Sequence, residues 1–108
     1  MFETITSLSN LDEFIWNSNQ QRKNIMLIFS ASWCGPCTSL KDYLKRENYE
    51  DKTNTRIAYI DIDSNDEIAA KYKIKSLPTQ VFVSVSLENN KAVVNETRRI
   101  VGFNPSLL

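Results

Sequence analysis

The hydrophobic positions along the chain change their period, and each period predicts a different element. The apolar residues at 11, 14 and 15 have helical spacing, and Ser9 or Asn10 can cap this helix, which we expect to run to about Ser18. Residues 25–29 are apolar at every position, in a run too short for a solitary helix. This run predicts a central parallel strand that is buried on both faces.

A second helix follows this strand closely, and two cysteines lie near the junction. The small residues 30–32 precede a Trp-Cys-Gly-Pro-Cys segment at 33–37. From Cys37 onward, the apolar residues 40, 43 and 44 fall on one side of a helix. The sequence therefore places the cysteines where a strand leads into a helix.

The rest of the chain continues this alternation and then predicts a hairpin. Residues 56–62 alternate loosely as a strand, and residues 64–67 match a capping box that opens a short helix. Residues 81–85 and 92–101 indicate two antiparallel strands joined by a polar turn at 88–90. Pro105 can begin a final helix, which we expect to be truncated. We predict an α/β fold with a mixed central sheet flanked by helices, in one domain over residues 1–108.

Composition and charge argue against several classes of protein. The chain has 108 residues, and its 13 Lys and Arg balance its 13 Asp and Glu without a strongly basic block. This balance gives no support for binding to nucleic acid or to an anionic membrane surface. No apolar stretch is long enough to cross a bilayer, and the first residues lack the pattern of a secretory signal. We therefore expect a cytoplasmic protein.

The cysteine count directs the search for chemistry. There are two cysteines and no histidine, so the commonest proton shuttle and the commonest transition-metal ligand are both missing. In a reducing compartment, two cysteines separated by two residues indicate a catalytic or a metal-binding pair. A zinc site within this chain would need two further ligands, so we expect no metal and favour redox chemistry at Cys34 and Cys37.

The position of each cysteine predicts a separate role. The nucleophile in disulfide exchange is a thiolate, whereas a free cysteine has a pKa of about 8.5. Cys34 at the start of a helix would face unpaired backbone N–H groups that favour the ionised sulfur, so we predict that it is the nucleophile. Cys37 lies one turn later and is expected to be the more buried, resolving thiol. Gly35 permits the close approach, and Pro36 fixes a helical φ.

The segment at 33–37 after an apolar strand resembles the active-site signature of the thioredoxin family. The resemblance covers nearly the whole chain and continues from Tyr59 to Thr79. The residues that match in order and spacing there are Asp63, Ala69, Tyr72, Ile74 and Leu77-Pro78-Thr79.

This resemblance implies a thioredoxin fold and a substrate-binding surface. Pro78 would be a cis-proline that packs beside the cysteine pair, and the backbone at Leu77 would pair with a bound substrate segment. Trp33, Leu77 and Gly102 would then outline the docking groove. The resemblance also implies that no cofactor is bound and that the redox group is the Cys34–Cys37 disulfide itself.

The sequence departs from the family's pattern at several positions. The family's buried acid falls at Ile28 and its lysine partner falls at Tyr59, so the usual proton-relay pair is absent. The proline that often kinks the active-site helix falls at Asp42. A few extra residues lengthen the region between residues 83 and 101. We therefore describe the chain as thioredoxin-like.

Our first hypothesis is a thioredoxin-like enzyme that reduces protein disulfides through a mixed disulfide. By resemblance, a thioredoxin reductase-like flavoenzyme would recycle it, and we expect the chain to be a monomer. A glutathione-coupled glutaredoxin fits less well, because the interior of the motif is Gly-Pro. A hypothesis of a different class is a binding or docking subunit in which the redox pair is incidental.

Overall fold

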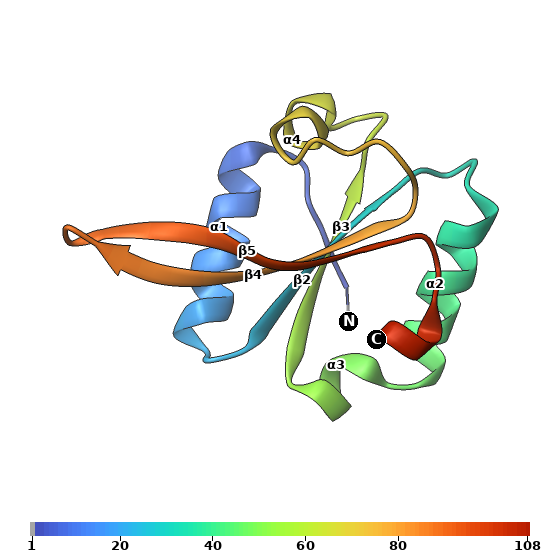
Figure 1. Ribbon diagram of the computed structural model, residues 1–108, viewed down its shortest axis with the longest axis horizontal. Coiled ribbons are helices and arrows are strands. Elements are labelled where there is room, and N and C mark those ends of the chain that lie inside the picture. The colour runs from blue at the N-terminus through green and yellow to red at the C-terminus, as the bar shows by residue number, and fades with distance from the viewer. Residues whose placement is uncertain (1) are drawn as a thin grey trace.

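A mixed five-stranded sheet organises the fold of residues 2–108, which the computed structural model describes. The strand order is β1-β3-β2-β4-β5, so β2 is central, as the sequence predicts. β1 and β2 run parallel to β3, whereas β4 runs antiparallel to β2 and β5 (Figure 1). The strands are β1 (Glu3–Thr4), β2 (Asn24–Ser30), β3 (Thr55–Asp61), β4 (Thr79–Glu88) and β5 (Lys91–Val101). The helices are α1 (Leu8–Gln20), α2 (Gly35–Arg46), α3 (Tyr49–Thr53) and α4 (Asp66–Lys71).

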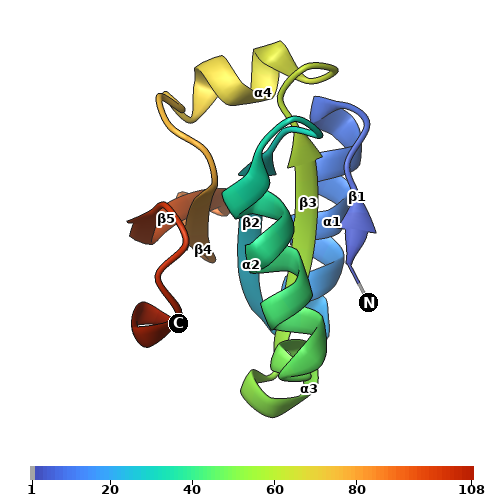
Figure 2. The ribbon, with the colours of Figure 1, turned by 90° about the vertical axis from the view of Figure 1, so that its right-hand side faces the viewer.

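β2 supplies side chains to both faces of the sheet, because apolar residues occupy successive positions along it. Leu27 and Phe29 pack with side chains of α1 in one buried cluster. Met26 and Ile28 point the other way and pack with residues of α2 in a second cluster. Figure 2 shows α2 in front of β2 and β3, with α1 behind the sheet. The fold is therefore a three-layer α/β arrangement, as predicted.

β4 and β5 form a hairpin that projects beyond the other strands (Figure 1). The pairing of β4 with β2 ends at Val83, whereas the pairing with β5 continues to Glu88. Asn89 and Asn90 form the turn with φ of 51° and 64°, in the left-handed region that asparagine tolerates. We call residues 84–96 the hairpin arm. The predicted hairpin is confirmed, and it is longer than the sequence indicates.

The predicted N-caps of two helices are wrong. α1 is capped by Ser7, whose Oγ accepts a hydrogen bond of 3.1 Å from the backbone N–H of Asn10. The Asn10 side chain instead accepts from the backbone N–H of Thr6 at 2.9 Å, which stabilises the turn before the helix. α4 begins only at Asp66, because the Ser64 hydroxyl donates to the Asp61 carbonyl and does not cap the helix.

The sequence did not predict the shortest elements. β1 has two residues and α3 has five, so neither shows a hydrophobic period. The helix expected from Pro105 is a single 3₁₀ turn over Pro105–Leu107. Within residues 2–108, no helix combines the length and the apolar character needed to cross a bilayer.

Candidate active site

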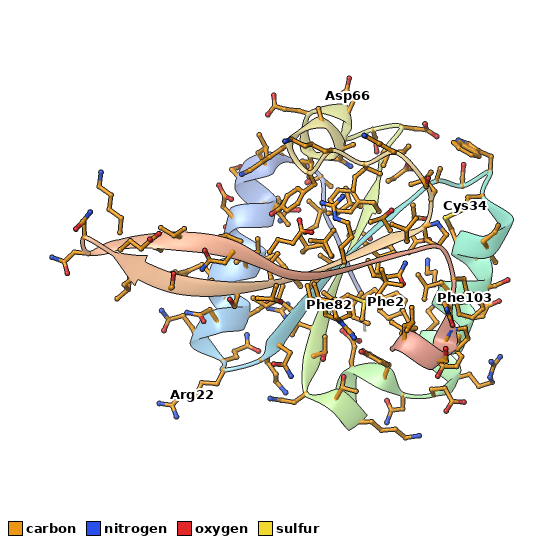
Figure 3. All side chains as sticks on the ribbon, viewed as in Figure 1. Phe2, Arg22, Cys34, Asp66, Phe82 and Phe103 are labelled. Carbon is orange, nitrogen blue, oxygen red and sulfur yellow. A yellow bond between two sulfur atoms is a disulfide. The ribbon has the colours of Figure 1, made fainter. Side chains whose placement is uncertain are left out.

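Cys34 and Cys37 form a disulfide where β2 leads into α2, with their Cα atoms 5.3 Å apart (Figure 3). Cys34 is the N-cap residue of α2, and its Sγ accepts a hydrogen bond of 3.3 Å from the backbone N–H of Cys37. The Cys34 N–H donates to the Ala31 carbonyl at 3.2 Å. Pro36 lies in the first turn, where a helix does not need its N–H. The start of α2 therefore holds the Cys34 sulfur beside backbone N–H groups.

The surroundings of the two cysteines are apolar. Both pack with Ala31 in a small buried cluster, and Ile62 and Leu77 cover the cluster from β3's end and from the segment before β4. Cys37 is 1% exposed, whereas Cys34 keeps 6%. Cys34 is thus the more accessible of the two, in agreement with the order that the sequence predicts.

Trp33 extends the site onto the surface. Its side chain is 69% exposed, and its Nε1–H donates to Oδ2 of Asp63 at 2.9 Å. The backbone N–H of Asp63 in turn donates to Oδ1 of Asp61 at 2.9 Å, which fixes the turn after β3. This contact orients a large exposed indole beside the cysteines. The sequence identified Asp63 only as a residue of the family resemblance and did not predict its contact with Trp33.

The segment before β4 forms the second side of the site. The Leu77–Pro78 peptide bond is cis, the conformation that the resemblance implies for Pro78. The Pro78 carbonyl accepts a hydrogen bond of 2.7 Å from the backbone N–H of Gly102. Gly102 has φ of 83°, which is strained for any residue with a Cβ. The structure therefore joins Pro78 to Gly102 and packs Leu77 on the cysteine cluster.

Polar side chains are buried on the face of the sheet that α2 covers, beside the apolar Ile28. Ser30 is fully buried, and its Oγ lies 2.6 Å from the hydroxyl of Tyr59. Gln80 is also fully buried, and its Nε2 donates to the Gly102 carbonyl at 3.3 Å. The sequence did not predict either contact. The signal for Ser30 was a single hydroxyl at the end of an otherwise apolar strand.

A surface hollow lies away from the cysteines. It has a volume of about 610 Å³ and is bounded by α1, by the end of α4 and by the hairpin arm. Its lining includes Ile15, Tyr72, Val94 and Arg99, and none of the predicted site residues contributes to it. The candidate active site therefore lies outside this hollow, at a surface where the Trp33 side chain is 69% exposed.

The chain resembles known thioredoxins in sequence and in fold. The family model described as Thioredoxin matches residues 4–103. The thioredoxin of Mycoplasma genitalium is 30% identical over 93 residues, which are 86% of each chain. Thioredoxin-1 of Drosophila yakuba is 38% identical over 69 residues, which are 64% of this chain and 61% of the relative. The crystal structure of a poplar thioredoxin h has a TM-score of 0.77 and 28% identity, and the alignment covers 98% of this chain and 88% of the poplar chain.

A further relative combines two proteins in one chain. It is a bifunctional thioredoxin reductase/thioredoxin of Mycobacterium leprae, 32% identical over 60 residues. These residues are 56% of this chain and 13% of the relative.

Proposed function

The chain belongs to the thioredoxin family and is a thiol–disulfide oxidoreductase, and from this premise we propose that it reduces protein disulfides with Cys34 as nucleophile and Cys37 as resolving thiol. The Cys34 thiolate attacks one sulfur of the substrate disulfide, and the other sulfur leaves as a thiolate. Cys37 then loses its proton and attacks Cys34 Sγ, which releases the second substrate thiolate. Two electrons pass to the substrate, and the Cys34–Cys37 disulfide remains.

The observation that carries this assignment is the position of Cys34 at the N-cap of α2. The N–H of Cys37 donates to its sulfur, and the positive end of the helix dipole favours a negative charge there. Cys37 lies inside the first turn and is nearly inaccessible, so a substrate reaches Cys34 first. Gly35 adds no side chain between the two cysteines, and Pro36 keeps the turn in one conformation.

Substrate binding is assigned to the surface that surrounds the pair. Trp33 supplies an exposed aromatic face, and its bond to Asp63 supports a fixed orientation. Leu77 lies two residues before Thr79, the first residue of β4, so its backbone is outside the sheet ladder, and we assign to it the pairing with an extended substrate segment. Pro78 and Gly102, which are joined by a backbone hydrogen bond, are assigned to the adjoining part of this surface.

Recycling is assigned to a thioredoxin reductase-like flavoenzyme. The reductase-fused relative from Mycobacterium leprae supports this partner class. The electrons and protons balance within the thiols and disulfides, so the chain needs no bound cofactor of its own. We further assign the protein to a reducing compartment such as the cytoplasm. We also propose that it is a monomer, and size-exclusion chromatography with light scattering tests this oligomeric state.

Reduction of insulin by dithiothreitol tests the activity. We expect the wild-type protein to accelerate the appearance of turbidity, and Cys34→Ser to leave the rate at the uncatalysed level. Ser39→Ala, which changes an exposed hydroxyl on α2, is the matched control and should keep the wild-type rate. A wild-type rate equal to that of Cys34→Ser would contradict the enzyme and favour a docking subunit.

Two chemical experiments test the separate roles of the cysteines. Iodoacetamide at neutral pH should label Cys34 before Cys37 in the reduced protein, because Cys37 is almost completely buried. Cys37→Ser should accumulate a stable mixed disulfide with a disulfide-containing substrate, because no second thiol can resolve it. Preferential labelling of Cys37 would reverse the assignment.

A further inference from the structure

The hairpin arm has two faces that differ in polarity. One face carries apolar side chains, those of Val85, Leu87, Ala92 and Val94. Val85 packs on the buried cluster that contains residues of α1, so this face lies on the α1 side of the sheet. The opposite face is mostly polar and consists of Ser84, Ser86, Glu88, Lys91, Val93 and Asn95. Leu87 is 72% exposed and Val94 is 41% exposed, so much of the apolar face is accessible to solvent.

Two adjoining hollows lie between this apolar face and α1. The hollow of about 610 Å³ described above and a second one of about 330 Å³ have lining residues in common, which are Asp12, Ile15, Ala92 and Val94. The second hollow is also lined by Trp16 of α1, which is 48% exposed. We call the two hollows together the arm groove. The arm projects on the side of the molecule opposite to α2 (Figure 1), which begins at the cysteines (Figure 3).

The outer edge of β5 is open beside this groove. β5 is the last strand in the sheet order, so its outer edge has no neighbouring strand among residues 2–108. Glu88 and Lys91 flank the two-residue turn, and such a flanking pair exchanges both backbone hydrogen bonds. Bonded and non-bonded pairs then alternate along the antiparallel ladder. Ala92 and Val94 belong to non-bonded pairs, so their backbone N–H and C=O groups point outward at the rim of the groove.

The base of the groove carries an excess of positive charge. Lys71 ends α4 and Lys73 follows it, and neither lysine makes an ion pair among residues 2–108. Arg99 is neutralised by Glu96, because two of its nitrogens donate to the two carboxylate oxygens. Asp12 of α1 offsets only one of the two lysines. The base therefore suits a carboxylate, whereas the apolar part of the groove suits aliphatic side chains.

We propose that the arm groove and the open edge of β5 bind an extended segment of a partner protein, which adds a strand to the sheet. The added strand runs antiparallel to β5 and pairs with the outward backbone groups of Ala92 and Val94. Its alternate side chains point into the groove, with aliphatic ones near Trp16 and an acidic one near Lys71 and Lys73. This surface lies apart from the cysteines, so the inference goes beyond the proposed exchange reaction and does not depend on it.

An extended polypeptide is the occupant that satisfies the backbone groups and the groove together. A small apolar molecule would fill the hollows and leave the outward N–H and C=O groups unpaired. A second copy of this chain fits less well. Symmetric pairing of two β5 strands about Val94 sets Ala92 of one copy against Glu96 of the other, so an alanine rather than a carboxylate lies at the base. Pairing about Glu96 meets the bulge opposite Phe82 and Val83, where the strand register shifts.

A synthetic peptide tests the strand pairing directly. The probe is Glu-Thr-Thr-Thr-Val-Thr-Val, acetylated and amidated at its ends, which has its glutamate and both valines on one face of a strand. A short added strand buries little area, so we expect weak affinity, which NMR titration of the oxidised, isotope-labelled protein detects at millimolar peptide. The amide signals of Ala92 and Val94 should shift and their hydrogen exchange should slow. Those of Cys34 and Cys37 should not change.

N-methylated peptides separate strand pairing from simple apolar contact. The N–H of the first valine of the probe faces β5 at Val94, so a methyl group on this nitrogen should lower the affinity about tenfold or more. The N–H of the next threonine points to solvent, and its methylation should leave the affinity nearly unchanged. A purely apolar contact would respond to both changes alike.

Charge reversal tests the base of the groove. Lys73→Glu should weaken binding of the probe about threefold and strengthen binding of a matched peptide with lysine in place of glutamate by a similar factor. Lys75→Glu is the control, because Lys75 is exposed but does not line the groove, and at physiological ionic strength it should change neither affinity. Lys73→Glu should also keep the wild-type rate of insulin reduction, since the groove lies away from Cys34.

Three results would overturn the inference. Signals of Ala92 and Val94 that do not respond at millimolar peptide would show that the edge is closed to an added strand. Equal loss of affinity with the two N-methylated peptides would show that no strand pairing occurs. If light scattering finds a dimer that the probe dissociates, the groove is filled by a second copy and not by a foreign segment. None of these results affects the roles proposed for Cys34 and Cys37, which the insulin and alkylation experiments test separately.

Discussion

The two ends of the hairpin formed by β4 and β5 have opposite properties. At the active-site end, Thr79, Gln80 and Val81 are at most 1% exposed, and Gly102 is bonded to Pro78. In the hairpin arm, Leu87 is 72% exposed and Val94 is 41% exposed. The same pair of strands is therefore held by packing at one end, whereas the arm is held by its own backbone ladder and turn together with the packing of Val85 against the core.

This difference shows where the fold needs rigidity. The proposed site combines two cysteines, a cis-proline and a glycine, and the cysteine cluster is joined through Ile62 and Leu77 to the larger buried cluster on the α1 side. The arm carries no site residue, and its turn at Asn89 and Asn90 needs only residues that accept a left-handed backbone. We expect the active-site end to tolerate few substitutions and the arm to tolerate many.

Native-state hydrogen exchange should show the largest contrast between the ends. Amides of β2 should exchange through global unfolding, which costs about 5 to 15 kcal/mol. Amides of the arm should exchange through local opening, which costs much less free energy than global unfolding. The two sets should differ in exchange rate by about 10³-fold or more, as measured by NMR or mass spectrometry. Equal protection in the arm and in β2 would show that the arm folds and unfolds with the body.

The free energy of unfolding gives the next contrast, through one substitution at each end. Ile28→Asp should lower it by roughly 2 to 5 kcal/mol, because a carboxyl replaces a fully buried side chain in contact with Leu40. Leu87→Asp places the same carboxyl on an exposed arm position and should change it by no more than about 0.5 kcal/mol. Urea melts of both variants measure the difference.

Disulfide-exchange kinetics sharpen the test of Ile28→Asp. Stopped-flow reaction of the reduced protein with 5,5′-dithiobis(2-nitrobenzoate) releases one thionitrobenzoate when Cys34 attacks and a second when Cys37 resolves the mixed disulfide. A carboxylate at position 28 would add a base on the α2 face, so the second release should become faster while stability falls. Leu87→Asp should leave the rates of both releases unchanged. An Ile28→Asp protein with wild-type stability would show that residue 28 is not in the core on this face.

The sequence predicted well those elements whose pattern of apolar and polar residues extends over several positions and fits only one kind of element. β2 was predicted because five apolar residues in succession have no alternative to burial, and the hairpin because polar residues interrupt two strand patterns. The N-cap of α1 was wrong because Ser7, Ser9 and Asn10 are all good caps, and tertiary packing of Leu8 chooses among them. β1 was missed because two residues acquire strand geometry only from their pairing with β3.

The candidate site shows a similar division. The pair at Cys34 and Cys37 follows from local spacing, which the sequence displays directly. The contacts of Trp33 with Asp63 and of Ser30 with Tyr59 join residues about 30 positions apart, so no local pattern contains them. Their discovery requires the register between β2 and β3, which places the ends of these strands side by side.

The junction between the arm and the body should respond to alkaline pH through Tyr72. Burial is the main cause that raises the pKa of Tyr72 above its usual 10.0, and the nearby charges of Asp12 and Glu96 add to it. The folded protein therefore retains the phenol proton more strongly than the unfolded chain, so stability is full below pH 10 and falls as the pH rises through the raised value. Tyr72→Phe should make this alkaline decline shallower in urea melts, and Tyr49, whose pKa burial also raises, should account for part of the remainder.

The smallest effect is expected at the base of the arm, where Glu96 and Arg99 form a two-point ion pair. Arg99 Nε and Nη2 donate to the two carboxylate oxygens at 2.8 and 2.9 Å, and Nη2 also donates to the Tyr72 carbonyl at 2.7 Å. The hydrogen bonds from Arg99 lower the pKa of Glu96 below its usual 4.5. The pair therefore stabilises the fold above that pH, and its contribution is lost as the pH falls through the lowered value.

Glu96→Gln tests this contribution and the connection of the arm to α4. Because both side chains are partly exposed, water screens the pair, and we expect the variant to lose no more than about 1 kcal/mol at neutral pH. The loss should shrink as the pH falls below the lowered pKa of Glu96, where the wild-type carboxyl is protonated as well. Glu88→Gln, near the tip of the arm, is the control and should match wild type at every pH. A loss for Glu96→Gln that stays constant down to acid pH would show that shape and hydrogen bonding, rather than charge, hold the arm to the body.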